Sequence, residues 1–285
     1  MSKICIVFDR LRSEEKLLEK QAIDLGHETK MVDAKITHFD TDSNKQNTDF
    51  GDVVLERCIS YYRGLHFTAC IEFLDVPIIN KFSVSSLCGN KMLTSIILKK
   101  NNIPTPKTYF SFSADAALEN IEKIGYPLII KPVVGSWGRS VIPLKDRDTA
   151  DAIIEQRGIT DGPLDRIFYL QEVVDRPPRD IRVITVNDRP IAAMYRKSSG
   201  GFKTNVALGA DPEICDITNE IEDLCAKASK AVGGGILGID LMEDKKRGLM
   251  VHEINNTVEF KGLIKVSKTN IPKEMIEFAL DSIRK

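Results

Sequence analysis

The chain has 285 residues, of which 42% are hydrophobic and 28% are charged, so we expect a globular protein with a sizeable core in two or three lobes. Its 40 basic and 41 acidic side chains leave a net charge of −1 without a long basic run, which argues against nucleic acid or a membrane surface as partner. No apolar stretch approaches the roughly 20 residues that cross a bilayer, and the N-terminal one is too short for a signal peptide. We therefore expect a cytoplasmic protein whose six cysteines, which lack metal-site spacing, stay reduced.

The first part of the chain, residues 1–86, is expected to form an N-terminal α/β domain. Short β-type runs alternate there with helical patterns, and this alternation is typical of a small parallel sheet. The expected strands are residues 3–8, 27–32, 52–55 and 76–80, and the expected helices are residues 13–25 and 64–74. No G-x-G-x-x-G follows the first strand, so a Rossmann dinucleotide site is not supported.

The middle of the chain, residues 87–168, is expected to form a second lobe. One helix over residues 83–101 carries Lys91 and ends before a segment with two prolines, which cannot continue a helix. The further expected helices are residues 113–124 and 148–156, and the expected strands are residues 128–132, 140–144 and 168–174.

The last part, residues 169–285, is expected to form a third lobe built on two hairpins. Strands over residues 180–186 and 190–195 flank Asn187-Asp188, a favourable hairpin turn. A helix over residues 218–232 stops at three glycines, Gly233 to Gly235. Strands over residues 238–243 and 249–255 then face each other across a charged turn.

A lysine and a glycine-bearing turn follow one another between residues 130 and 140. Glycines let backbone N–H groups approach a phosphate closely, and Lys131 supplies a compact positive charge. The sequence lacks the G-K-[ST] of a Walker A motif. The turn therefore indicates either a phosphate-binding loop or an ordinary hairpin turn.

Three oxygen donors are expected to meet on the last hairpin. Glu253 and Asn255 are two residues apart on one strand and share a face, and Asp240 lies on the neighbouring strand. Hard oxygen ligands suit Mg²⁺, which keeps other positions for water and phosphate. The alternative is a solvated acidic face, but the strands are otherwise apolar and buried charges need a partner. His252, between the two ligands, is expected to point to the opposite face.

A third cluster combines a strand end with charged side chains. A strand end presents exposed backbone groups, which can hydrogen-bond an adenine edge, while a carboxylate can bind ribose. A surface patch of ion pairs would explain the same residues. The cluster consists of Gln171, Glu172, Val173, Val174, Asp180 and Arg182.

Taken in order, these stretches resemble the ATP-grasp superfamily over nearly the whole chain. The similarity is greatest to the ligases of carrier-protein-dependent lysine and arginine biosynthesis and to the RimK-like ribosomal-protein glutamyl ligases. The stretches that carry the resemblance are LERC, KPVVGSWGR, RDIRV, KTNVALG and EINNTVEFKG. The resemblance implies an α/β fold of three lobes with ATP held between the second and the third.

The same resemblance assigns roles to individual residues. Lys91 and Lys131 would contact phosphates, and Asp240, Glu253 and Asn255 would bind Mg²⁺. The residues implied in nucleotide binding further include the loop Gly135, Ser136, Trp137, Gly138, Arg139, Ser140 and Val141, the cluster from Gln171 to Arg182, and Asn205. Arg196, Val206 and Ala207 would lie near the acceptor, with Arg196 stabilising the reaction's oxyanion or holding the acceptor's carboxylate.

The reaction that the resemblance implies uses ATP and Mg²⁺ to turn a carboxylate, a poor electrophile, into an acyl phosphate that an α-amine attacks. No Ser/His/Asp or Cys/His signature is present, and none is needed for such a step. The activated group would be the side chain of the C-terminal Glu of a small acidic carrier protein like LysW. We also expect a homo-oligomer, a dimer or a tetramer.

The acceptor is the open question. The family's specificity segment falls on Glu259, Phe260, Lys261, Gly262 and Leu263. Gly262 resembles the glutamate ligases and Leu263 departs from both groups, so we favour glutamate, with α-aminoadipate or dual use as alternatives. One methylene separates the two acceptors, worth only about 1–3 kcal/mol in a pocket. Glutamylation of a ribosomal protein or peptide tail, and nucleotide binding without catalysis, are the rival functions.

Overall fold

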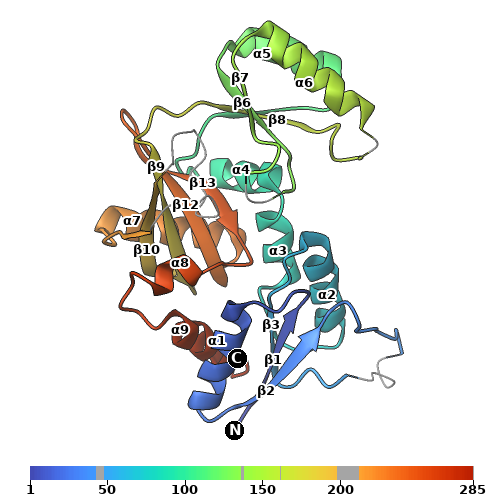
Figure 1. Cartoon of the computed structure of the whole chain (residues 1–285), viewed down its shortest axis with the longest axis vertical. Coiled ribbons are helices and arrows are strands. Elements are labelled where there is room, and N and C mark those ends of the chain that lie inside the picture. Colours follow the sequence, from blue (N-terminus) through green and yellow to red (C-terminus); the bar gives the residue numbers. More distant parts are fainter. Residues whose placement is uncertain (43–47, 136–137, 161, 198–211, 285) are drawn as a thin grey trace.

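The computed structural model describes residues 1–42, 48–135, 138–160, 162–197 and 212–284. Three sheets follow one another along the long axis of the molecule (Figure 1). The N-terminal sheet lies at one end, the sheet of β5 to β8 at the other, and the sheet of β9 to β13 between them. The α/β fold class predicted from the sequence is thus confirmed.

The N-terminal sheet is parallel throughout, as the alternation of strand and helix predicts. Its strand order is β2-β1-β3-β4. The central strand β1 is buried along nearly its whole length, which a sheet covered by helices requires. The strands are β1 Lys3–Phe8, β2 Glu28–Asp33, β3 Val53–Glu56 and β4 Ile78–Ile79, and the helices are α1 Ser13–Asp24 and α2 Tyr61–Phe73.

The helix predicted over residues 83–101 is wrong as a single element, because two helices, α3 Phe82–Cys88 and α4 Lys91–Lys100, meet at a break. Gly89 lies directly against the ring of Tyr61, where an added Cβ would fall 1.7 Å from Cε2. Asn90 then caps α4, and its side chain accepts hydrogen bonds from two backbone N–H groups of the first turn. Lys91 consequently stands at the start of a helix.

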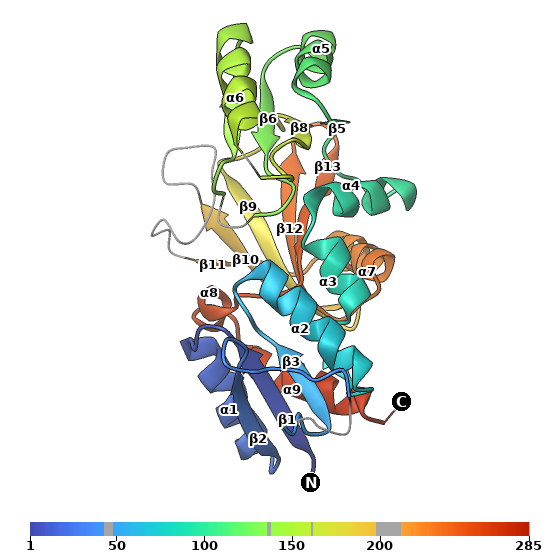
Figure 2. The ribbon, with the colours of Figure 1, turned by 90° about the vertical axis from the view of Figure 1, so that its right-hand side faces the viewer.

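The second sheet is antiparallel, with the order β5-β8-β6-β7. Its helices lie beside β6 at the upper end of the molecule (Figure 2). A separate apolar core forms between helices and sheet, with Ile121, Ile130 and Phe168 fully buried. The strands are β5 Thr108–Ser111, β6 Leu128–Lys131, β7 Ile142–Leu144 and β8 Phe168–Glu172, and the helices are α5 Ala114–Ile124 and α6 Arg147–Ile159.

The third sheet is also antiparallel, with the order β11-β10-β9-β12-β13. Asn187 and Asp188 both have positive φ, 47° and 66°, as a two-residue hairpin turn of type I′ requires. Helix α7 packs on this sheet and ends at Gly233 in the left-handed region. The elements are β9 Arg179–Val186, β10 Arg189–Lys197, β11 Glu213–Ile214, α7 Asn219–Val232, β12 Ile236–Asp244 and β13 Gly248–Asn255.

The end of the chain returns to its beginning. Helices α8 Lys261–Ile264 and α9 Ile271–Ser282 follow β13, and α9 lies beside α1 in both ribbon views. One apolar core therefore contains Ile4 and Leu18 from the N-terminal domain together with Phe260 and Met275. This shared core anchors the N-terminal domain to the third sheet and fixes their relative positions.

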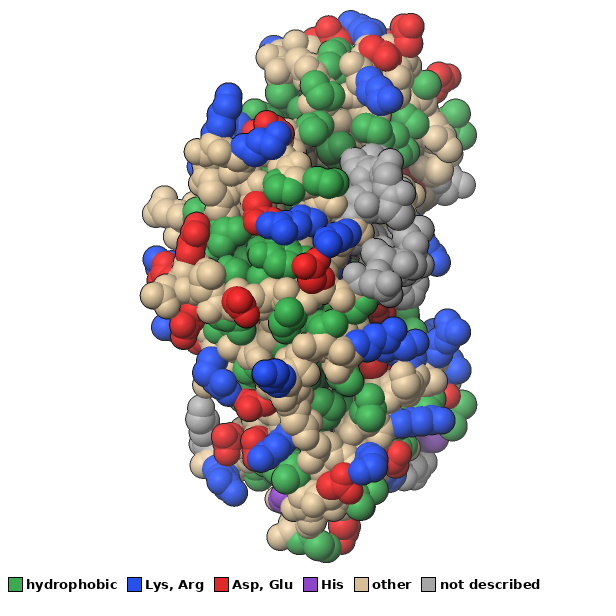
Figure 3. Space-filling model, turned by 60° about the vertical axis from the view of Figure 1, so that its left-hand side comes forward, with side chains coloured by type: hydrophobic (Ala, Val, Ile, Leu, Met, Phe, Trp, Pro, Cys, Tyr) green, Lys and Arg blue, Asp and Glu red, His purple; other side chains and the backbone are tan. Residues whose placement is uncertain are grey.

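The surface fits the balanced composition. Basic and acidic side chains are interspersed over the face seen in Figure 3. Within the described ranges, no helix combines the length and apolarity that a membrane crossing demands. The six cysteines are free thiols.

Candidate active site

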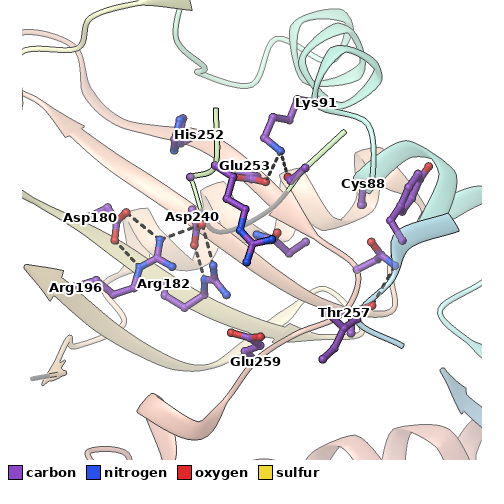
Figure 4. Close-up of a pocket in the computed structure, with 18 of the residues that line it drawn as sticks. Cys88, Lys91, Asp180, Arg182, Arg196, Asp240, His252, Glu253, Thr257 and Glu259 are labelled. Atoms are coloured by element: carbon purple, nitrogen blue, oxygen red, sulfur yellow. Dashed lines mark hydrogen bonds and ion pairs between the residues drawn. The ribbon is translucent and has the colours of Figure 1, made fainter. Parts of the chain in front are cut away.

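A cavity of about 1190 Å³ opens between the three sheets and collects most of the predicted site residues. Its volume exceeds the roughly 300–1,000 Å³ of a pocket for one small molecule, so it has room for a nucleotide and a second substrate. Figure 4 shows the wall formed by β9, β10, β12 and β13. The predicted residues that line the cavity are Lys91, Lys131, Gly135, Gly138, Arg139, Val141, Gln171, Glu172, Val173, Val174, Asp180, Arg182, Arg196, Asp240, Glu253, Asn255, Glu259, Lys261 and Gly262.

Lys131 ends β6 as a buried ammonium group between neutral partners. Its Nζ lies 2.6 Å from Oε1 of Gln171 and 2.6 Å from Nε2 of His252, and its side chain is only 5% exposed. The amide of Gln171 is itself fixed, because its NH₂ group donates to Tyr169 and Thr108. Burial lowers the pKa of Lys131 to about 7, since desolvation disfavours the charged form. An anion in the cavity would stabilise that charge.

His252 faces the cavity, so the prediction that it points to the opposite face is wrong. The pairing of β12 with β13 shifts between Asp240, which opposes Glu253, and Leu241, which opposes Val251. His252 is the extra residue of this β-bulge, and a bulge re-aims the side chains next to it. Burial holds the pKa of His252 well below its usual value, so the ring is neutral and its Nε2 accepts a hydrogen bond from the ammonium group of Lys131.

Lys91 connects the loop that contains Gly135 to the third sheet. Its Nζ donates to the carbonyl oxygen of Gly135 at 2.5 Å and lies 3.1 Å from Oε1 of Glu253 (Figure 4). Its backbone N–H bonds to Val133, which holds the start of α4 against the loop. Ser140 does not line the cavity, whereas Ser136 and Trp137 lie outside the described residues.

Two acids and two arginines alternate across β9, β10 and β12. The guanidinium of Arg196 donates to both oxygens of Asp180, at 2.7 and 2.9 Å, and its Nη2 lies 3.0 Å from Oδ2 of Asp240. Arg182 forms a two-pronged contact with Asp240 from the other side (Figure 4). Burial alone would raise the pKa of Asp240, but the two arginines hold it well below its usual value. The predicted Arg196 is therefore aimed into the cavity by carboxylates on both sides.

The predicted metal ligands fit Mg²⁺ by donor type. Asp240 and Glu253 pair across β12 and β13, and Asn255 follows two residues on. Arginines lie against Asp240 and Lys91 lies against Glu253, while each carboxylate oxygen has two lone pairs and can accept more than one contact. Within the described ranges no three His, Cys, Asp or Glu side chains converge, so an amide and phosphate oxygens would have to complete the coordination sphere.

The predicted nucleotide cluster separates into two groups. Gln171 and Glu172 stand on β8, where Glu172 accepts the backbone N–H of Lys107 at 2.8 Å and pairs with Arg247 at 2.6 Å. Asp180 and Arg182 belong instead to the charge network of the third sheet. Strand β8 and the sheet of β9 thus contribute separate walls of the cavity.

The predicted specificity segment also divides. Glu259, Lys261 and Gly262 line the cavity, whereas Phe260 and Leu263 are completely buried in the core and do not line it. Asn205, Val206 and Ala207 lie outside the described residues.

Several residues of the N-terminal domain that line the cavity were not among the predicted site residues. Arg10, Arg12 and Glu14 lie outside every stretch that carries the resemblance, and the return of α8 to α1 brings them to the cavity. Glu56 and Cys58 belong to the stretch LERC, but no site role was assigned to them. Arg12 bonds to Glu259 at 3.3 Å, and Glu14 accepts the backbone N–H of Lys261 at 3.0 Å. The N-terminal residues on this side of the cavity include Arg10, Arg12, Glu14, Glu56, Cys58 and Tyr61.

A lysine-bearing loop, a carboxylate and amide set and three sheets around one cavity together define a nucleotide-dependent ligase of the ATP-grasp type. Comparison with known proteins agrees: the chain belongs to the RimK-like ATP-grasp family, whose domain matches residues 88–279, and a LysX preATP-grasp domain matches residues 4–87. The chain is an ATP-dependent amino-acid ligase, and ligases of this family use ATP with Mg²⁺.

Relatives along the full length sharpen the family assignment. The chain is 38% identical to the α-aminoadipate–LysW ligase LysX of Sulfurisphaera tokodaii, over 98% of this chain and 99% of the relative. It is 32% identical to the glutamate–LysW ligase ArgX of Sulfolobus acidocaldarius, over 97% of each chain. In fold it is similar to a RimK domain ATP-grasp protein from Sphaerobacter thermophilus, with a TM-score of 0.77 and 21% identity over 98% of this chain and 99% of the other.

Proposed function

We propose that this ligase joins the side-chain carboxylate of the C-terminal Glu of a small acidic carrier protein, similar to LysW, to the α-amine of glutamate. The observation that carries the proposal is the meeting of Lys91 and Lys131 with Asp240, Glu253 and Asn255 on one cavity. Lysines suit a phosphate chain and oxygen donors suit the magnesium ion that accompanies it. The names of the full-length relatives, LysW ligases of two kinds, supply the substrate class.

The charges of the site suggest which residues would contact the phosphates, the magnesium ion and the nucleotide. ATP with Mg²⁺ supplies the phosphoryl group that activates the carboxylate as an acyl phosphate. Lys131 and Lys91 would hold phosphate oxygens, while Asp240, Glu253 and Asn255 would hold the ion. Gln171, Glu172, Val173 and Val174, together with the loop residues Gly135 and Gly138 to Val141, would border the nucleotide.

Arg196 would act at the reacting centre. Its guanidinium is almost fully buried and is held by Asp180 and Asp240, so it needs no reorganisation when negative charge develops nearby. Burial works against its charge, yet the two carboxylates raise the pKa of Arg196, and the group stays a cation at every pH of interest. A permanent, fixed cation suits the oxyanion that forms when an amine attacks.

The part of the cavity wall around Gly262 bears on which amino acid is the acceptor. Gly262 stands against Met194, since a Cβ on residue 262 would lie 3.1 Å from Cε of Met194 and 3.2 Å from its sulfur. Leu263 is fully buried in the core, so of residues 262 and 263 only residue 262 would border the acceptor. Glycine here resembles the glutamate ligases. The greater identity to an α-aminoadipate–LysW ligase favours the second candidate, α-aminoadipate as acceptor or use of both.

We also propose the division of the chain into lobes of residues 1–86, 87–168 and 169–285. The three sheets follow these borders closely, and β8, at Phe168–Glu172, stands across the second one. The site would then lie where all three lobes meet.

Mass spectrometry of the carrier tests the function. The protein is incubated with ATP, Mg²⁺, an acidic carrier protein and either glutamate or α-aminoadipate, and a ribosomal-protein tail serves as the rival substrate. We expect the carrier to gain one glutamate residue with release of ADP. A mass gain on the tail alone, or ADP release that ignores both substrates, contradicts the proposal.

A further inference from the structure

Glu56 places a buried carboxylate on the cavity wall without a cationic partner. It is the last residue of β3, lines the cavity and is only 6% exposed. Among the described residues it forms no ion pair; it accepts hydrogen bonds from the backbone N–H of Cys58 at 2.5 Å, from the thiol of Cys58, and from the hydroxyl of Thr257 at 3.4 Å. Buried acids normally pair with a cation or a metal, so this one calls for an explanation.

The neighbouring charges do not supply the missing cation. Arg57, the next residue, directs its guanidinium toward Glu15 at 3.3 Å and over the ring of Phe260. Asp9, the residue after β1, is an acid already paired with Arg63 at 2.6 Å. Burial raises the pKa of Glu56, an effect that its bond to Cys58 and the charge of Arg57 only partly oppose.

The fold reserves space for this carboxylate. Gly64, in the first turns of α2, also lines the cavity, and a Cβ added there would fall 2.6 Å from Oε1 of Glu56. Any side chain at this position would therefore push the carboxylate out of place. Thr257 comes two residues after the predicted metal ligand Asn255, which ends β13, and two residues before Glu259, where the predicted specificity segment begins. Glu56 therefore lies beside the link between β13 and that segment.

We infer that Glu56 binds the α-ammonium group of the acceptor amino acid, an inference that rests on the proposed function. An amino acid brings one cation into the cavity, and an uncompensated buried carboxylate is the group that such a cation would neutralise. The position, at the border between the N-terminal domain and the end of β13, would hold the amine next to the predicted specificity segment, in the cavity that also contains the two lysines.

The first test replaces Glu56 by glutamine, which keeps an acceptor for the N–H of Cys58 and removes only the charge. We expect Glu56→Gln to raise KM for the amino acid by about 10- to 100-fold, the range for loss of a hydrogen bond to a charged group. KM for ATP and the affinity for ATP in calorimetry should stay unchanged, which a general structural defect would not allow. An unchanged KM for the amino acid overturns the inference.

Asp9→Asn is the matched control, because Asp9 is a buried acid of the same domain whose counter-ion the protein provides. It should lower stability without a selective rise in KM for the amino acid. An equal rise in both variants would show a structural effect and would also overturn the assignment.

A second measurement needs no variant. Glutarate is glutamate without its amino group, and as an inhibitor it should bind the wild-type enzyme about 10-fold or more weakly than glutamate if the ammonium is bound by a carboxylate. In Glu56→Gln the two affinities should converge. Equal affinities in the wild type overturn the inference even if the variant does not fold. Failure of the proposed function looks different, because the wild type would then release ADP without any dependence on an amino acid.

Discussion

The buried charged groups of the cavity are of two kinds: those on the third sheet form ion pairs with one another, and two others form none among the described residues. On the third sheet, Arg182 and Arg196 neutralise Asp180 and Asp240 at hydrogen-bond distance, so two cations meet two anions. Elsewhere on the cavity wall, Lys131 and Glu56 are as deeply buried, yet their hydrogen-bond partners within the described ranges are neutral groups. The protein has completed one set of ion pairs and left the other incomplete.

The difference indicates where the charges of the substrates belong. A buried charge without a counter-ion costs free energy, and a ligand of opposite sign recovers it. Lys131 is suited to a phosphate anion and Glu56 to an ammonium cation, while the neutralised network orients Arg196 and stays in place. On this view, removing a member of the network costs stability, and removing an unpaired charge does not.

The largest effect is expected for Asp240→Asn. The variant removes a proposed metal ligand and leaves Arg182 without its carboxylate, so we expect turnover to fall by about 10³-fold and stability to fall by about 3 kcal/mol, as for a broken buried pair. Turnover and urea unfolding measure the two effects. Asp244→Asn, at the far end of β12 in an ion pair with Arg247, is the control and should keep its activity. Wild-type rates in Asp240→Asn would remove Asp240 from the site.

Lys131→Met should separate activity from stability. We expect kcat/KM to fall by about 10²-fold or more, since the proposed phosphate contact is lost, while stability stays equal or rises because a desolvated charge becomes an apolar side chain. The pKa of Lys131 also predicts how the free energy of unfolding changes with pH. The pKa of Lys131 in the folded protein, about 7, lies below the ordinary 10.5, so the folded state binds fewer protons between these values.

Stability of the nucleotide-free wild type should consequently increase between about pH 7 and pH 10, and the increment should be missing in Lys131→Met. Urea unfolding at several pH values measures it. Lys91→Met is the control, because the ion pair of Lys91 with Glu253 predicts a loss of stability instead. Equal losses in the two variants would abolish the distinction between paired and unpaired lysines.

A smaller effect is expected at His252, which acts through Lys131. His252→Leu removes the acceptor that holds the ammonium, and we expect kcat/KM for ATP to fall by about 10-fold, the value of one hydrogen bond. His252→Gln restores an acceptor and should recover most of the loss. KM for the amino acid should be the same in both variants. If glutamine and leucine behave alike, the contact between His252 and Lys131 has no role in catalysis.

The sequence predicts what depends on neighbours in the chain. The strand over residues 3–8 is found with the same ends, because a short run of five apolar side chains is typical of a buried strand. Lys91, Lys131, Gln171 and Glu253 reach one cavity, as the ordered motifs indicate.

The errors arise where distant residues decide the geometry. The break at Gly89 depends on the ring of Tyr61, and the orientation of His252 depends on a bulge that the pattern of β13 does not reveal. Glu56 and its contact Thr257 are 201 residues apart, so no local pattern connects them. Packing across domains cannot be read from periodicity along one strand or helix.

The smallest effect concerns the choice of acceptor, where shape rather than charge decides. In Gly262→Asn the new side chain would collide with Met194, so we expect turnover with both amino acids to fall. The double variant Gly262→Asn with Met194→Ala opens that space and should shift the ratio of kcat/KM toward α-aminoadipate by about 10-fold, the lower end of what one methylene provides. Met194→Ala alone is the control for lost core packing.

Leu263 should be left unchanged in this experiment, although it belongs to the same segment. Its side chain is fully buried, so Leu263→Ser would place a hydroxyl in the core and cost stability without reaching the acceptor. Competition between the two amino acids at equal concentration, read by mass spectrometry of the carrier, measures the ratio. An equal shift in the single and the double variant would show that Met194 does not limit the pocket, and an unchanged ratio in both would place the selectivity elsewhere on the cavity wall.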